Sequence, residues 1–251
     1  MRILVAIPVF NEESYIPRVL SHVLEYADDV LVVDDGSTDR TPQLLCKFPV
    51  EVIRHAKNRG YGRSLRDSFT FAACHGFDWV VTMDCDEQHE PTSIPDFLEA
   101  ARENRWDLIS GSRYLTSMDD ETRPPADRRA INEQITSEIN ERLGPLFSSP
   151  LTDSFCGFKA HRVSAMKRLN LSEDGYAFPM QLWVQAAAQG LRVCEIPVKL
   201  IYKDLTRTFG GNLDNPGTRL QHYRCVLHQE LVTQRMLLPP AALVGASRCG
   251  T

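Results

Sequence analysis

The chain has 251 residues, of which 43% are hydrophobic and 24% are charged, a composition typical of a globular protein that excludes a disordered or low-complexity chain. With 28 Lys and Arg against 33 Asp and Glu, the net charge is −5. This balance also excludes non-specific binding of nucleic acid, because contact with its phosphates needs an excess of basic residues.

Short apolar strands and amphipathic helices alternate over the first 115 residues. Continuous apolar runs such as 3–7 and 30–33 are typical of strands that are buried on both faces of a sheet. We predict strands at 3–7, 30–33, 51–54, 79–83 and 108–110, and helices at 13–26, 64–75 and 93–103. Alternation at this spacing predicts an α/β protein with an open, mostly parallel sheet.

The pattern changes after Pro124 and Pro125. A helix is predicted over 127–143, in which Ile131, Ile135 and Ile139 recur at every fourth position, and we expect this stripe to pack on the core. The remaining predicted elements are a short segment at 152–160, a helix at 179–189, a strand at 192–198 and a helix at about 219–235.

The sequence predicts neither a leader nor a membrane span. The chain opens directly into the apolar strand at 3–7, without a signal peptide. No apolar run approaches the ~20 residues that a spanning helix needs. We therefore expect a cytoplasmic protein. From Val198 onward seven basic residues face three acidic ones, a balance that suits contact with an anionic partner.

Polar residues gather where the predicted strands end, at 8–12, 34–39 and 84–88. Ligands of open α/β sheets bind at this edge, and clustered carboxylates usually imply a cation between them. Asp84 and Asp86 are two residues apart, so both can reach one divalent ion, and oxygen ligands suit Mg²⁺ or Mn²⁺. We expect His89, beside them, to be an ordinary surface residue. Neither a phosphate-binding P-loop nor a G-x-G-x-x-G motif is present.

Seven segments in chain order resemble the motifs of inverting GT-A glycosyltransferases of family 2. They are Ile7–Glu13, Val32–Thr41, Asn58–Gly62, Met83–Pro91, Ser110–Tyr114, Asp153–Lys159 and Gly175–Phe178. The full set is similar to that of the polyprenyl-phosphate (dolichyl-phosphate) mannose and glucose synthases, and it covers residues 2–213. The resemblance implies a nucleotide-sugar-binding half at 1–115, an acceptor-side half at 116–213 and a partly helical tail at 214–251.

The resemblance also implies roles for particular residues. A GDP- or UDP-linked sugar would be held by Pro8, Phe10, Glu12, Val33, Asp35, Asp84, Cys85, Arg113 and Arg207. The metal, Mg²⁺ or Mn²⁺, would be held by Asp84, Asp86 and Gln88. Arg128 or Arg129 would bind the acceptor phosphate, because a guanidinium can contact two phosphate oxygens at once. The catalytic residues would be Asp86, Arg113 and Asp153.

The expected reaction moves a hexose from the nucleotide to a polyprenyl phosphate at the cytosolic membrane face. The metal and the arginines would stabilise the leaving diphosphate. A phosphate acceptor is already anionic and needs no general base. A hydroxyl acceptor would need one, and Asp153 is the candidate. Asp153 can equally serve only to organise its loop, and the sequence leaves both roles open.

Two departures from the subfamily pattern concern the acceptor. Leu213 stands where a phosphate-binding lysine is common, and Gln181 stands where a glutamate is common. The alternatives are therefore a family 2 enzyme with a hydroxyl acceptor and a catalytically silent nucleotide-sugar binder. In the lipid-phosphate hypothesis, the basic tail and the isoleucine-striped helix near Arg128 would meet the lipid.

Overall fold

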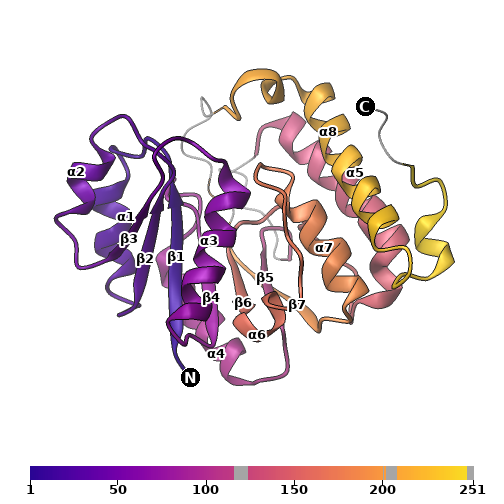
Figure 1. Cartoon of the computed structure of the whole chain (residues 1–251), viewed down its shortest axis with the longest axis horizontal. Helices are drawn as coiled ribbons and strands as arrows, with labels where there is room; N and C mark the ends of the chain where they lie inside the picture. Colours follow the sequence, from indigo (N-terminus) through magenta and orange to yellow (C-terminus); the bar gives the residue numbers. More distant parts are fainter. Residues whose placement is uncertain (116–123, 200, 202–207, 248–251) are drawn as a thin grey trace.

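A computed structural model of the chain describes residues 1–115, 124–199, 201 and 208–247. These residues build a seven-stranded sheet with the order β3-β2-β1-β4-β6-β5-β7 (Figure 1). The strands are β1 (Ile3–Val9), β2 (Val30–Asp34), β3 (Glu51–Arg54), β4 (Trp79–Thr82), β5 (Leu108–Ser112), β6 (Lys159–Arg162) and β7 (Val193–Pro197). β6 runs antiparallel to β4 and β5, whereas the other neighbours are parallel. The predicted fold class is confirmed.

Helices connect the strands. The α-helices are α1 (Ile16–Val23), α2 (Thr41–Leu45), α3 (Tyr61–Cys74), α4 (Ile94–Arg102), α5 (Ala126–Leu143), α6 (Val163–Met166), α7 (Phe178–Ala188) and α8 (Pro216–Thr233). Short 3-10 turns occur at Pro91–Ser93, Gly144–Leu146, Gly211–Asp214 and Pro240–Leu243. Within the described part of the chain, none of the helices combines the length and the apolar character that a membrane crossing requires.

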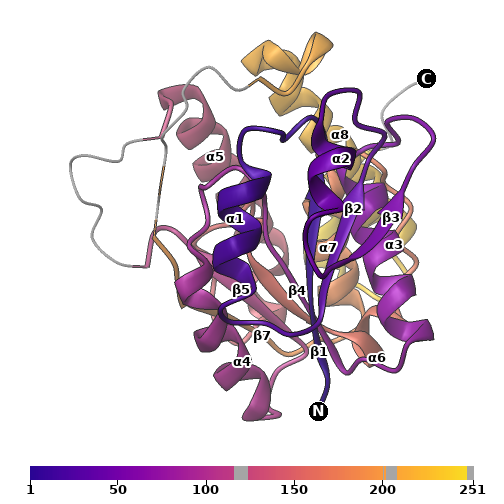
Figure 2. The ribbon, with the colours of Figure 1, turned by 90° about the vertical axis from the view of Figure 1, so that its left-hand side faces the viewer.

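The helices cover both faces of the sheet (Figure 2). Side chains alternate along β1, so that Leu4 and Ala6 join one apolar cluster while Val5 and Ile7 join the other. The first cluster contains residues of α3, α5, α6, α7 and α8, and the second contains residues of α1, α2 and α4. Two packed layers therefore hold the sheet rigid and leave its carboxyl edge as the place for a site.

Strand β6 differs most from the prediction. Its sequence, Lys159-Ala-His-Arg162, has no apolar run, so periodicity placed a segment at 152–160 instead. The strand forms because its backbone pairs with β4 on one side and with β5 on the other. Two of its polar side chains, Lys159 and His161, are buried as a result, with exposed fractions of 3% and 1%.

The isoleucine stripe of α5 packs on the core, as expected. Ile131, Ile135 and Ile139 all belong to the first apolar cluster, and the last two are fully buried. These three side chains cover the core, so a lipid contact of this helix would involve its other residues.

Helix α8 is attached to α7 through a buried carboxylate. Glu230 of α8 accepts hydrogen bonds from the side-chain amides of Gln181 and Gln185, at 2.9 Å each. The side-chain oxygen Oε1 of Gln181 accepts hydrogen bonds from the backbone N–H groups of Ser172 and Glu173. A glutamate at position 181 would place a second carboxylate against Glu230, and the two negative charges would repel each other. The amide of Gln181 avoids this repulsion and donates a hydrogen bond instead.

Truncation of Ile135 to Ala tests the role of α5 as a core helix. We expect a loss of about 2–5 kcal/mol in the free energy of unfolding, because a fully buried side chain leaves a cavity. Urea denaturation measures it. Gln134→Ala, on the exposed side of the same helix, is the control and should change stability by less than about 0.5 kcal/mol. Equal effects of the two changes would contradict this packing.

Candidate functional site

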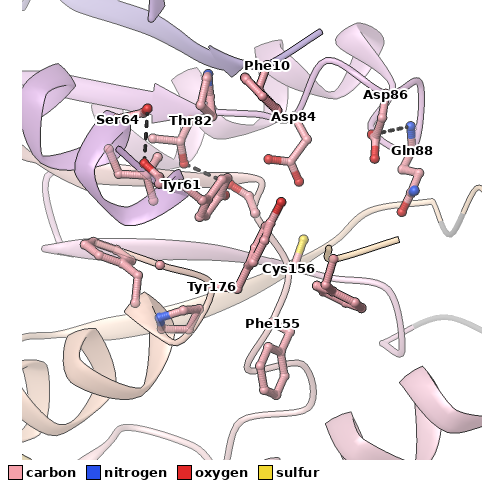
Figure 3. A pocket seen from close by; sticks show the side chains of 18 of the residues that line it. Phe10, Tyr61, Ser64, Thr82, Asp84, Asp86, Gln88, Phe155, Cys156 and Tyr176 are labelled. Carbon is pink, nitrogen blue, oxygen red and sulfur yellow. Dashed lines mark hydrogen bonds between the residues drawn. The ribbon is translucent and has the colours of Figure 1, made fainter. Parts of the chain in front are cut away.

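A cavity of about 550 Å³ lies at the carboxyl ends of the strands. One wall comes from the residues after β1, β2 and β4, and the opposite wall comes from α5, α8 and the loop before α7. Figure 3 shows Asp84 and Asp86 on one side of it and the rings of Tyr176 and Phe155 on another. The expected edge of the sheet therefore carries the site.

The cavity gathers most of the residues singled out from the sequence. Those that line it are Pro8, Phe10, Glu12, Asp35, Asp84, Cys85, Asp86, Gln88, Arg113 and Arg128. Val33, Arg129 and Asp153 do not line it. The Val33 side chain is fully buried in the core beneath the site. Arg207 lies outside the described residues.

Asp35, which follows β2, is held by the loop after β3. Its Oδ1 accepts the backbone N–H of Arg59 and its Oδ2 that of Gly60, both at 2.8 Å. Gly36 has a φ of 79°, and a Cβ there would lie 2.4 Å from the carbonyl carbon of Lys57. Because only glycine fits this approach, the loop can close on the carboxylate and fix it at the cavity wall.

Asp84 and Asp86 lie on the loop after β4. Burial and the neighbouring Asp84 raise the pKa of Tyr61 well above its usual value, so its hydroxyl stays protonated and donates a hydrogen bond to Asp84. Gly157 also packs on this carboxylate, since an added Cβ would lie 2.5 Å from Asp84 Oδ2. Asp86 Oδ1 accepts the backbone N–H of Gln88 at 3.1 Å, which turns the loop and brings all three side chains to the cavity.

These oxygen donors fit a divalent cation. No group of three or more His, Cys, Asp or Glu side chains suited to a metal occurs among residues 1–115, 124–199, 201 and 208–247. Two carboxylates and an amide oxygen, completed by water and substrate phosphates, are nevertheless a usual set for Mg²⁺. The Nδ1 atom of His89 accepts the backbone N–H of Asp84 at 3.0 Å, so this histidine supports the loop that carries the two carboxylates. It is also buried, which corrects the expected surface position, and burial lowers its pKa to about 4.

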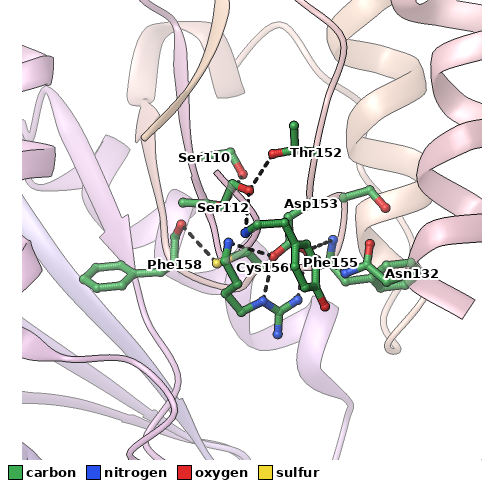
Figure 4. Close-up of polar contacts among 12 residues, drawn as sticks. Ser110, Ser112, Asn132, Thr152, Asp153, Phe155, Cys156 and Phe158 are labelled. Carbon is green, nitrogen blue, oxygen red and sulfur yellow. Dashed lines mark hydrogen bonds and ion pairs between the residues drawn. The ribbon is translucent and has the colours of Figure 1, made fainter. Parts of the chain in front are cut away.

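Arg113, directly after β5, is locked by Asp153, which Figure 4 shows near Asn132. Its Nε and Nη2 donate to the two carboxylate oxygens at 2.6 and 2.9 Å, and its backbone N–H donates to Oδ2. Asn132 of α5 donates to Oδ1 at 2.7 Å. Burial alone would raise the pKa of Asp153, but the charge of Arg113 and these hydrogen bonds lower it to about 2.

Asp153 itself is fully buried, and its backbone N–H donates to Glu195 of β7. A carboxylate that is withdrawn from the cavity, saturated with donors and hard to protonate is poorly suited to accept a proton from a substrate. The geometry therefore favours the second of its two possible roles, which is to organise the loop and to hold Arg113 at the cavity wall.

The neighbouring arginines of α5 are separated by the structure. Arg128 lines the cavity, and its guanidinium lies 4.9 Å from the ring centre of Phe209. Arg129 instead donates to Glu133 one turn further along the helix, at 2.7 Å. Helix geometry explains the difference, because consecutive residues point about 100° apart. Arg128 is thus the member of the pair that can meet a ligand in this cavity.

Helix α8 supplies residues to the cavity that lie in none of the sequence motifs. Arg219 is 3% exposed and lines the cavity. Its guanidinium lies 4.4 Å from the centre of the Phe209 ring, which Arg128 also contacts. Its Nη2 pairs with Asp127 at 2.5 Å, and its Nη1 donates to the carbonyl of Leu213. A second guanidinium therefore stands beside the position where the lysine is missing.

Aromatic rings also line the cavity without having been predicted. Tyr61 stacks on Tyr176 at 5.9 Å, Tyr176 meets the edge of Phe209 at 5.3 Å, and Phe155 packs on Tyr223 at 4.8 Å. Tyr61 and Tyr176 lie in motifs that the sequence had marked, whereas Tyr223 belongs to the tail. This side of the cavity therefore carries many rings, with guanidinium groups among them.

Replacing Asp153 by Asn should destabilise the protein in a pH-dependent way. Near neutral pH we expect a loss of about 3–5 kcal/mol, because Arg113 keeps its charge without a partner. The folded-state pKa of about 2 lies below the ordinary aspartate value of 3.8, so the ionised form stabilises the fold above about pH 4, and this stabilisation is lost as the pH falls toward 2. Urea denaturation of both proteins at pH 7, 4 and 3 should show their difference shrinking, and a constant difference would contradict the ion pair.

Comparison with known proteins agrees with this geometry. The undecaprenyl-phosphate mannosyltransferase of Micrococcus luteus is 29% identical over 220 residues, which cover 82% of this chain and 86% of that protein. The polyprenol monophosphomannose synthase of Mycolicibacterium smegmatis is 28% identical over 225 residues, 84% of this chain and 83% of that protein.

A solved structure shares the fold. The glucosyl-3-phosphoglycerate synthase of Mycobacterium tuberculosis, in complex with Mn²⁺, UDP and its product, superposes with a TM-score of 0.71 at 19% identity, over 91% of this chain and 79% of that one. Residues 4–169 of this chain match the profile of the family described as glycosyl transferase family 2. The chain belongs to glycosyl transferase family 2.

Proposed function

We propose that this glycosyltransferase moves a hexose, mannose or glucose, from a nucleotide diphospho-sugar to a polyprenyl phosphate. The observation that carries the proposal is a single cavity with two chemically different walls. Asp35, Asp84 and Asp86 line one wall, whereas Arg128, Arg219 and aromatic rings line the other. The first wall suits a nucleotide with its metal, and the second suits a phosphate on an apolar chain.

The donor side follows from the fixed carboxylates. Asp35 can accept hydrogen bonds from the ribose, and Pro8, Phe10 and Glu12 lie beside it at the end of β1. Asp84, Asp86 and Gln88 would hold Mg²⁺ or Mn²⁺, which when bound would offset the charge of the leaving diphosphate. Arg113, held by Asp153, would add a guanidinium of fixed orientation to the same charge.

The acceptor side follows from the opposite wall. Arg128 would contact the acceptor phosphate, with Arg219 next to it, and the rings of Tyr176, Phe209 and Tyr223 would contact the first isoprene units. A phosphate oxygen would attack the anomeric carbon from the face opposite the leaving group, which inverts its configuration. No general base is needed, in keeping with the withdrawn position of Asp153.

A polyprenyl phosphate is anchored in a membrane. We therefore extend the proposal to a peripheral contact at the cytosolic membrane face, on the side where α5 and α8 border the cavity. The relatives named as mannosyltransferases of undecaprenyl and polyprenyl phosphates support this acceptor. They leave the nucleotide of the donor open.

A panel of nucleotides tests the donor side. UDP, GDP, UDP-glucose and GDP-mannose are each added with Mn²⁺, Mg²⁺ or EDTA, and the unfolding temperature is recorded. We expect one nucleotide to stabilise the protein in the presence of metal, by about 2.7 kcal/mol at 100 times its dissociation constant. The Asp84→Asn, Asp86→Asn double variant should lose the part of this stabilisation that depends on metal. Absence of any shift in the native protein would overturn the donor assignment.

The pair of arginines on α5 tests the acceptor side. Arg128→Gln should lower the transfer to polyprenyl phosphate about 10- to 100-fold, because a charge-assisted hydrogen bond to phosphate is lost. Arg129→Gln, one residue away and outside the cavity, should stay within about twofold. Sugar transfer to a labelled short-chain prenyl phosphate measures both. Equal effects of the two changes would refute the acceptor site.

A further inference from the structure

Asp35 has a third partner, His55, that none of the sequence motifs includes. The residue follows β3, and its Nδ1 lies 2.6 Å from Oδ1 of Asp35. On the other side of the ring, Nε2 lies 2.9 Å from Oδ2 of Asp67, on α3. Both the His55 and Asp35 side chains are almost fully buried, with exposed fractions of 5% and 6%. A histidine is thus enclosed between two carboxylates directly behind the cavity wall.

Each ring nitrogen lies within hydrogen-bond distance of a carboxylate oxygen, so the ring connects Asp35 to Asp67. An N–H group at Nδ1 donates to Oδ1 of Asp35. Asp67 is held in turn by Nε of Arg63, at 2.8 Å. Arg63, Asp67, His55 and Asp35 therefore form one chain of contacts from α3 to the cavity.

The contacts of Asp35 decide which of its oxygens can meet a ligand. Oδ1 accepts two hydrogen bonds, from His55 and from the backbone of Arg59, which fills its two lone pairs. Oδ2 accepts one from the backbone of Gly60. The second lone pair of Oδ2 is the position that the described contacts leave for a hydroxyl at the cavity.

We propose that His55 is a positioning residue for the nucleotide: it fixes the rotation of the Asp35 carboxylate so that Oδ2 accepts one ribose hydroxyl. The inference rests on the proposed function, because it needs a nucleotide in this cavity. Without His55, Oδ1 loses its strongest donor, and the carboxylate can rotate or bind water. The cost then falls on ribose binding and not on the chemistry at the anomeric carbon.

Two conservative variants separate positioning from simple stability. The amide nitrogen of Asn can replace Nδ1 and reach Asp35, whereas that of Gln replaces Nε2 and reaches Asp67. We expect His55→Asn to keep the affinity for nucleotide within about threefold, and His55→Gln and His55→Ala to lose about tenfold or more. Unfolding temperatures of the three variants, measured in parallel, show whether each remains folded at the assay temperature.

The decisive readout uses the ribose itself. Dissociation constants are measured by calorimetry, with Mn²⁺, for UDP and GDP and for their 2′-deoxy and 3′-deoxy forms. One deoxy form should bind the native protein more weakly than the parent nucleotide does. For that form, the His55→Gln change should raise the dissociation constant by less than a further factor of two. With the intact donor sugar, His55→Gln should raise KM and leave kcat nearly unchanged.

The outcomes distinguish this inference from the function beneath it. Binding of neither UDP nor GDP to the native protein would overturn both. Normal nucleotide binding with an equal loss for ribose and deoxy forms in His55→Gln would overturn the positioning role alone. The same holds if His55→Asn and His55→Gln lose affinity equally, because only one of them keeps the contact to Asp35.

Discussion

Negative charge at the carboxyl edge of the sheet is the constraint on which this site depends. Asp35, Asp84, Asp86 and Asp153 all follow strands or enter from neighbouring loops, and each must be compensated. The compensation differs: Asp35 receives backbone amides and His55, Asp84 receives the Tyr61 hydroxyl, and Asp153 receives Arg113. These differences separate Asp35, Asp84 and Asp86, which line the cavity, from Asp153, which does not.

The ion pair between Arg113 and Asp153 links the two halves of the site. Arg113 follows β5, whereas Asp153 is tied to Glu195 of β7 and to Asn132 of α5. A buried carboxylate of this kind costs free energy unless its partners are well placed. Here Arg113 and Asn132 supply those partners, and the same contacts prevent the guanidinium at the cavity wall from rotating. A rigid arginine is more useful to a developing diphosphate charge than a mobile one, because it needs no reorganisation during the reaction.

The sequence predicted the parallel strands, most of the longer helices and the carboxylates that line the cavity, because each was visible locally. Apolar runs marked the strands, and Asp35, Asp84 and Asp86 follow them directly. It did not predict β6, whose buried Lys159 and His161 depend on pairing with two distant strands. Nor could it choose between Arg128 and Arg129, or assign Arg219 and Tyr223 to the cavity. Those answers require the direction of a helix face and the packing of a tail helix, which no local pattern contains.

The packing of α8 connects the two departures from the subfamily pattern. The amide of Gln181 allows Glu230 to approach α7, and Glu230 takes further amide donors from Gln185 and Gln234. With α8 held there, Arg219 reaches the carbonyl of Leu213 and the ring of Phe209 at the end of the cavity. This one interface thus places a guanidinium, paired with Asp127, beside Leu213, the position at which a lysine is common in the subfamily pattern.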